Sequence, residues 1–269
     1  MTPWVPALIA LVIWWFPTGT LLMAVKYADR EGPTARLRAT IAGAPLLPLG
    51  GYGAHWSATQ TDVLGVYVAF LSALAIWGWI ELAFLTGIIT GPNRSPLPPR
   101  TPEWERFIRA WGTLAYHEML LIAALIALGL ALWDAPNAFG FWTFAVLFFA
   151  RVSAKLNLFF GVARTHVEFL PDALSHLSSH FRAAGMNWLF PISVTALTFA
   201  AACWLERLYA AETMGEITGF ALLTALTALA TLEHWVMVLP IPDERLWRWM
   251  LPAPKPHEHQ KTQGGHHGL

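Results

Sequence analysis

The chain has 269 residues, of which 56% are hydrophobic and only 13% charged, and its formal net charge is zero. This composition is typical of a polytopic membrane protein. A single cysteine, Cys203, excludes a disulfide framework. The sequence has no Walker loop, dinucleotide-binding glycine motif, paired-cysteine motif or zinc-type His and Cys spacing, and we expect no nucleic-acid partner.

Seven apolar stretches follow one another along the chain, and most reach the length of about 20 residues that a helix needs to cross a bilayer. Only helices and closed barrels satisfy their backbone groups in lipid, and apolar runs this long are helices. The predicted helices cover residues 4–25, 39–54, 63–89, 107–133, 139–161, 188–206 and 217–239. We therefore predict an all-α integral membrane protein whose transmembrane domain, residues 1–250, is a bundle of seven helices.

The second stretch is the weakest, because Pro45, Pro48, Gly50, Gly51 and Gly53 interrupt it. Proline removes a backbone donor and clashes with the preceding turn, so a kinked or broken helix is expected here. The second stretch must still cross the membrane. The connection before it and the connection after the third stretch are both basic, so they lie on the same side, and an even number of crossings must separate them.

The basic residues predict the orientation of the bundle. Sixteen of the seventeen Lys and Arg residues fall on one side of a seven-helix threading, and Arg207 is the exception. Cytoplasmic loops carry the excess of Lys and Arg in membrane proteins. We therefore expect a periplasmic N-terminus, a cytoplasmic C-terminus and a location in the bacterial inner membrane, cytoplasmic or intracytoplasmic.

Two cytoplasmic segments follow from this threading. A short amphipathic helix near residues 172–184, with Leu174, Leu177 and Phe181 on one side, is predicted to lie at the lipid surface. His176 and His180 are four residues apart and would share a face of that helix. Residues 251–269 are polar and rich in histidine, so they are predicted to form a disordered cytoplasmic tail.

Ionisable residues lie at membrane depth in four of the predicted helices. They gather in one layer, roughly 6 to 15 Å from the cytoplasmic end at about 1.5 Å per residue. Five charges facing lipid would cost on the order of 12 to 17 kcal/mol, so they must face the bundle interior, pair with one another or be neutral. The layer consists of Glu81, Glu118, Arg151, Lys155 and Glu233, with His117 and His234 beside two of them.

Two interpretations of this layer stand. In the structural one, Arg151 and Lys155, one helical turn apart, bridge the three glutamates and lock the bundle. In the functional one, His117 and His234 hold a cofactor, with bacteriochlorophyll or haem as the candidates. A di-iron site would need Glu-x-x-His spacing, which this chain lacks, and the residues suggest neither a metal site nor catalytic residues.

Several local strings resemble one family. They are ELAFLTGIITGPNR (81–94), SAKLNLFFGV (153–162), EFLP (168–171), PISVT (191–195), LEHWVMVLPIPD (232–243) and LWRW (246–249). Together they resemble the PuhE-type photosynthetic complex assembly proteins of purple phototrophic bacteria, over about residues 1–250. The resemblance implies a role in building the reaction centre and its light-harvesting complex, or in modulating bacteriochlorophyll supply to them.

We therefore predict a membrane assembly factor that is not an enzyme. Its expected partners are the lipid bilayer, reaction-centre or light-harvesting subunits, and other assembly factors. Two alternatives stay open: a membrane redox enzyme that uses the His and Glu cluster around haem or metal, and a carrier of pigment precursors.

Overall fold

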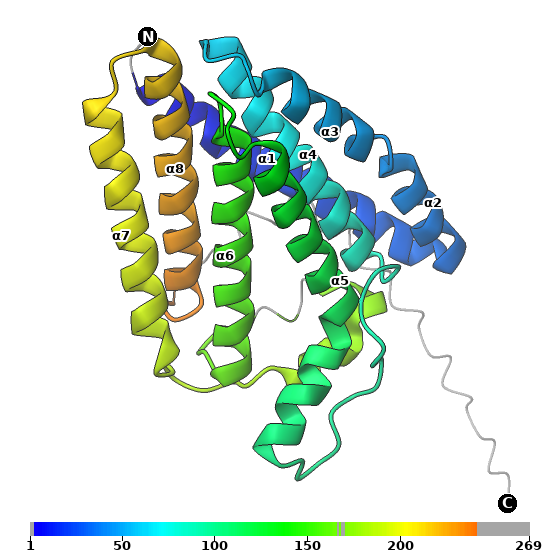
Figure 1. Cartoon of the computed structure of the whole chain (residues 1–269). Helices are drawn as coiled ribbons and strands as arrows, with labels where there is room; N and C mark the ends of the chain where they lie inside the picture. Colours follow the sequence, from blue (N-terminus) through cyan, green and yellow to red (C-terminus); the bar gives the residue numbers. More distant parts are fainter. Residues whose placement is uncertain (1–2, 166, 168–169, 241–269) are drawn as a thin grey trace, which may run out of the picture.

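A computed structural model describes residues 3–165, 167 and 170–240 of the chain. All regular elements in this part are helical, as Figure 1 shows. They are α1 (Trp4–Glu31), α2 (Pro33–Gly43), α3 (Leu46–Ser57), α4 (Val63–Leu85), α5 (Glu103–Ala131), α6 (Phe139–Phe160), the 3₁₀ helix η2 (Asp172–His180), α7 (Leu189–Ala210) and α8 (Met214–Val236). The predicted tail, residues 251–269, lies outside the described residues.

Six of these helices are long and apolar enough to cross a membrane: α1, α4, α5, α6, α7 and α8. Their bounds lie within a few residues of six of the predicted stretches. The largest difference is in α1, which continues through Lys26 and Arg30 to Glu31 and is followed by Gly32, where φ is +96°. The polar residues at the end of α1 lie beyond its apolar stretch. They can continue the helix because water can hydrate their charged side chains there.

The predicted second stretch is split into α2 and α3, with the break at Ala44 and Pro45. The two short helices nevertheless follow one line along α4, which they contact in antiparallel order. Thr40 meets Thr86 with their hydroxyl oxygens 2.8 Å apart. Gly50 comes next along the pair and lies against Ile76 and Ser72 of α4. α2 and α3 together therefore cover the same length of the bundle as α4.

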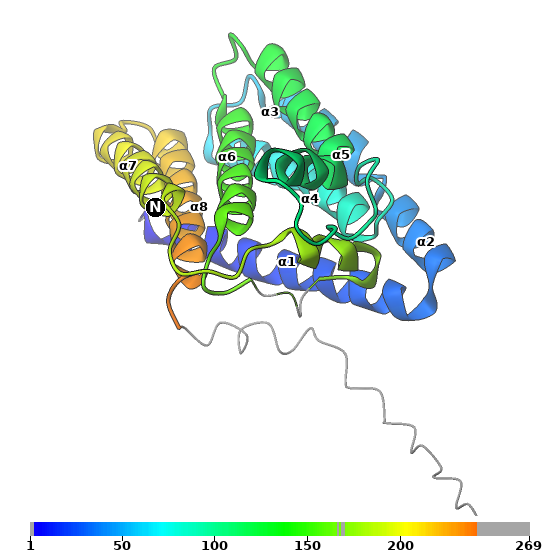
Figure 2. The same cartoon turned by 90° about the horizontal axis from the view of Figure 1, so that it is seen from below.

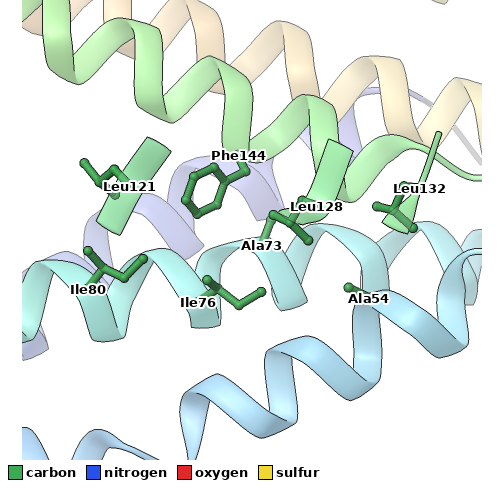
Figure 3. Close-up of a cluster of buried hydrophobic side chains, with 8 residues drawn as sticks. All are labelled: Ala54, Ala73, Ile76, Ile80, Leu121, Leu128, Leu132 and Phe144. Atoms are coloured by element: carbon green, nitrogen blue, oxygen red, sulfur yellow. The ribbon is translucent and has the colours of Figure 1, made fainter. Parts of the chain in front are cut away.

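α4 lies at the centre of the fold and packs against α1, α2, α3, α5, α6 and α8. Its side chains are mostly apolar around the whole helix, with Glu81 as its one charged residue, which is typical of a helix that has neighbours on most sides. Figure 3 shows the main core cluster around it, in which Ile76 and Ile80 of α4 meet Leu121 of α5 and Phe144 of α6. Glycines on α3 let it approach α4 closely, because a Cβ on Gly50 or on Gly53 would collide with Ser72 of α4.

The connections fall at two opposite ends of the bundle. At one end, the Asn137 amide donates to Gln60 O at 2.7 Å, which joins the α5–α6 connection to the α3–α4 connection. At the other end, the segment between α6 and α7 crosses beneath the helices, as Figure 2 shows from below. Its contacts there include Lys26 Nζ to Leu170 O at 2.8 Å and Arg164 N to Met237 O at 3.0 Å. This second end is the one that the charge distribution assigns to the cytoplasm.

The structure has a short helix with one apolar face near the predicted residues 172–184, but its type and extent differ from those we expected. It is a 3₁₀ helix that ends at His180, and its Leu174 and Leu177 are buried against Phe84 of α4. In a 3₁₀ helix, residues three apart share a face. His180 therefore joins Leu174 and Leu177 on the buried face, whereas His176 lies on another. Leu174, Leu177 and Phe181 are three and four residues apart, and this spacing fits an α-helix as well as a 3₁₀ helix.

Candidate functional site

The two cations of α6 each form an ion pair with a different helix. Arg151 Nη2 lies 3.0 Å from Glu81 Oε2 on α4, and Lys155 Nζ donates to Glu118 Oε1 on α5. Residues four apart lie on one face of a helix, so α6 presents both cations toward the same region. Glu81 and Glu118 are nearly fully buried, with side chains 9% and 4% exposed. The structure thus brings together four of the five predicted charged residues.

Glu233 is the fifth, and it does not share the burial that we expected. It lies on an exposed position of α8, where its carboxylate accepts a hydrogen bond of 2.9 Å from Trp14 Nε1 of α1. The neighbouring His234 takes the inward face instead and is buried. Adjacent residues diverge by about 100° around a helix, so only one of the two can point into the bundle.

His234 is hydrogen-bonded at both ring nitrogens. Nδ1 lies 2.8 Å from Ala230 O and must donate, because a carbonyl oxygen only accepts. In the neutral ring Nε2 then accepts from the Ser153 hydroxyl, at 2.9 Å. This arrangement joins α8 to α6 and leaves no ring nitrogen of His234 open to a ligand.

His117 has the opposite environment. Its side chain is fully buried, and neither ring nitrogen has a hydrogen-bond partner among the described residues. The ring packs on Phe84 with centroids 4.3 Å apart, and Nε2 lies 3.7 Å from Glu81 Oε1. At that distance the contact is electrostatic rather than a hydrogen bond. Of the two predicted ligand histidines, only His117 keeps a free nitrogen.

The segment between α4 and α5 fixes the position of His117. Thr90 O accepts from the His117 backbone nitrogen at 3.0 Å, and Asn93 N donates to Gly112 O at 2.9 Å. The chain passes so close to α5 that a Cβ on Gly91 would lie 2.8 Å from the backbone nitrogen of Leu114. Glycine at position 91 therefore permits this segment to bond into the middle of a membrane-length helix.

A cavity of about 420 Å³ lies beside the ion pairs, between α5, α6 and η2. Glu118, Arg151 and Lys155 form its polar wall, and most of the remaining lining is apolar and aromatic, including Phe84, Phe148 and Phe159. The volume falls in the range of about 300 to 1,000 Å³ that is usual for small-molecule sites. His117 and His234 are not among the lining residues.

The end of this cavity nearest η2 depends on residues that the sequence did not single out. Arg106 of α5 is buried, donates to Phe159 O of α6 and to His180 O of η2, and stacks its guanidinium 4.0 Å from the Phe159 ring centroid. Glu103 pairs with both Arg106 and Arg182. In the sequence, Arg106 was one of many cations that we predicted to lie on the cytoplasmic side, and no local signal marked it as buried.

His180 completes that end of the cavity. It is 3% exposed, its Nε2 lies 3.4 Å from Ser95 O, and its Nδ1 has no partner among the described residues. Burial lowers the pKa of His180; the Ser95 hydrogen bond opposes that effect, and Arg106 and Arg109 add to it. The imidazole is therefore neutral at neutral pH, with a proton on Nε2 facing Ser95 and a lone pair on Nδ1.

The residues present do not form an evident metal site. Within residues 3–165, 167 and 170–240, no three side chains of His, Cys, Asp or Glu gather in a way that could hold a metal ion. His117 lies near Glu81, but Arg151 pairs with the same carboxylate, and a nearby cation opposes metal binding. The site is therefore a set of interhelical ion pairs beside an apolar cavity.

The fold and this site define a multi-pass helical membrane protein with paired charges inside its bundle. The chain belongs to the family described as "Protein of unknown function (DUF3623)", whose model matches residues 1–258. It is 56% identical over 252 residues to an "Uncharacterized 30.4 kDa protein in puhA 5'region" of Rhodobacter capsulatus, covering 93% of this chain and 92% of that protein. No solved structure matches the chain significantly. Neither the family nor this relative indicates an enzyme.

Proposed function

We propose that this protein is a membrane assembly factor for the photosynthetic reaction centre and its light-harvesting complex, of the PuhE type. The observation that carries the proposal is the 56%-identical relative from the puhA 5′ region, because that gene context supports a role in photosynthesis. The sequence strings that carry the resemblance all lie within residues 1–258, which the family model matches. The factor acts by contact with pigment-protein subunits in the inner membrane and modulates bacteriochlorophyll supply to them.

The proposal includes seven membrane crossings, with α2 and α3 acting together as one kinked span. It is supported by the antiparallel contacts of α2 and α3 along α4, and by the connections at two opposite ends of the bundle. Loop charges then favour a periplasmic N-terminus and a cytoplasmic C-terminus. The ion pairs Arg151–Glu81 and Lys155–Glu118 serve in this proposal to hold α4, α5 and α6 together.

A deletion strain tests the assembly role. We expect loss of assembled core complex, measured by its near-infrared absorption in isolated membranes, while transcripts of the structural genes are unchanged. The intact gene supplied on a plasmid should restore the complex. Unchanged core-complex levels under several light and oxygen regimes would overturn the proposal.

A second candidate, a haem- or metal-dependent redox protein, draws support from one observation. The two ring nitrogens of His117 are buried without hydrogen-bond partners among the described residues, and a buried polar group normally has one. A visible absorption band that depends on His117 in the purified protein would favour this candidate over the assembly factor.

A further inference from the structure

We propose that the cavity between α5, α6 and η2 binds one elongated, uncharged amphipathic molecule that enters from the lipid phase, a long-chain alcohol in chemical class. Its hydroxyl group donates a hydrogen bond to Nδ1 of His180, and its chain lies between α5 and α6. This site goes beyond the assembly role and does not depend on it.

The shape of the cavity indicates a chain. The lining residues run along α5 from Phe107 to Ile122 and along α6 from Phe148 to Phe159. At about 1.5 Å per residue these stretches measure roughly 17 to 22 Å. An extended slot of this length, walled by aromatic and aliphatic side chains, matches an acyl or prenyl chain.

The cavity reaches the outer surface of the bundle along α5. Phe107, Trp111 and Ile122 line it, yet they are 47%, 46% and 39% exposed. On a membrane-length helix such exposed apolar side chains face lipid. A lipid-soluble molecule can therefore enter sideways from the bilayer, without passing through water.

The charges in the wall argue against an anionic ligand. Arg151 is paired with Glu81, and Lys155 with Glu118, so each cation is already neutralised. A free carboxylate or phosphate group brought into this wall would face the Glu118 carboxylate and would compete with Glu81 and Glu118 for cations that they already pair. An uncharged molecule meets no such repulsion and keeps both ion pairs intact.

The polar end of the cavity points to a hydrogen-bond donor on the ligand. His180 lines the cavity and is only 3% exposed. Its Nδ1 has no partner among the described residues. Because Nε2 faces the carbonyl oxygen of Ser95, Nε2 carries the proton and Nδ1 can only accept. A hydroxyl group is the simplest donor that a single-chain lipid carries.

Photolabelling of the full chain in nanodiscs tests this site. The probe is a hexadecanol that carries a diazirine on its chain, and mass spectrometry locates the labelled peptides. We expect labels on the stretches of α5 and α6 that line the cavity. Unlabelled hexadecanol should compete about tenfold better than hexadecane, a ratio that corresponds to one hydrogen bond.

Two variants and a matched control separate binding from folding. Ala110→Phe fills the cavity from α5 and should abolish labelling, whereas Ala123→Phe lies on an exposed, non-lining position of the same helix and should not. His180→Leu should remove the advantage of hexadecanol over hexadecane while the hydrocarbon chain still labels α5 and α6. Labelling that is unaffected by Ala110→Phe, or equal competition by the two compounds in the unaltered protein, would overturn the proposal.

Discussion

Lys155 on α6 donates a hydrogen bond to Glu118 on α5, and the two side chains are only 17% and 4% exposed. Such a pair is costly to bury but more costly to break, because the surviving charge loses its compensation. Together with Arg151 and Glu81, it makes α6 the helix whose charges join α4 to α5.

Lys155→Met should destabilise the protein strongly, by about 3 to 5 kcal/mol, since it leaves the buried Glu118 carboxylate unpaired. Adding Glu118→Gln should recover a large part of that loss, because the uncompensated charge is then gone. Thermal unfolding in detergent and accumulation in the membrane measure both effects. Arg207→Ala, at an exposed position on α7, serves as the control. If Lys155→Met alone were as stable as the unaltered protein, the pair would have no structural role.

Gly50 should be intolerant of even a methyl group, whereas Gly51 should accept one. A Cβ on Gly50 would lie 2.8 Å from Ser72 O of α4, while a Cβ on Gly51 would meet nothing within 4 Å. Gly50→Ala should therefore push α3 away from α4 and cost about 1 to 3 kcal/mol. Gly51→Ala should be neutral or slightly stabilising, because alanine favours helix over glycine. Thermal midpoints of the two variants measure the difference, and equal midpoints would show that α3 does not pack on α4 in this register.

The crossing of α2 and α3 can be tested by reporter fusions at their two ends. A reporter active only in the periplasm should be inactive after Gly32 and active after Thr59, because the kinked pair then carries the chain across the bilayer. The same reporter should be active after Asp134 and inactive after Leu251. Identical activity after Gly32 and Thr59 would leave six crossings and place both termini on one side.

Much of this architecture could be predicted from the sequence, because the bilayer sets the length of the apolar stretches that become helices. The six long helices begin and end near the predicted positions, and prolines marked the break between α2 and α3. The partners of Arg151 and Lys155 could be limited to a few glutamates, because ions inside a membrane must find one another.

Three features of the site could not be predicted, for different physical reasons. Glu233 and His234 are adjacent, and nothing local tells which one faces inward. The 3₁₀ form of η2 depends on packing against Phe84, so the four-residue spacing of His176 and His180 was misleading. The burial of Arg106 arises from carbonyl oxygens at Phe159 and His180, which are distant in the chain.

His117 and His234 should respond in opposite ways to substitution by leucine. His234→Leu leaves the Ala230 carbonyl and the Ser153 hydroxyl without their partner, which should cost about 1 to 3 kcal/mol. His117→Leu removes a ring whose nitrogens make no hydrogen bond to the described residues, so its effect on the thermal midpoint should be neutral or slightly stabilising. Both variants are measured in mild detergent, from cells that produce pigment.

The same preparations test the cofactor hypothesis. If His117 binds a chlorin or haem, the unaltered protein should show a visible absorption band that His117→Leu abolishes and His234→Leu retains, because of these two histidines only His117 has a ring nitrogen without a partner among the described residues. If the protein is colourless and His117→Leu is nevertheless strongly destabilising, His117 has a partner other than a pigment. An ordered water between Nε2 and Glu81 would then be the simplest such partner, since the two atoms lie 3.7 Å apart and each needs one more hydrogen bond.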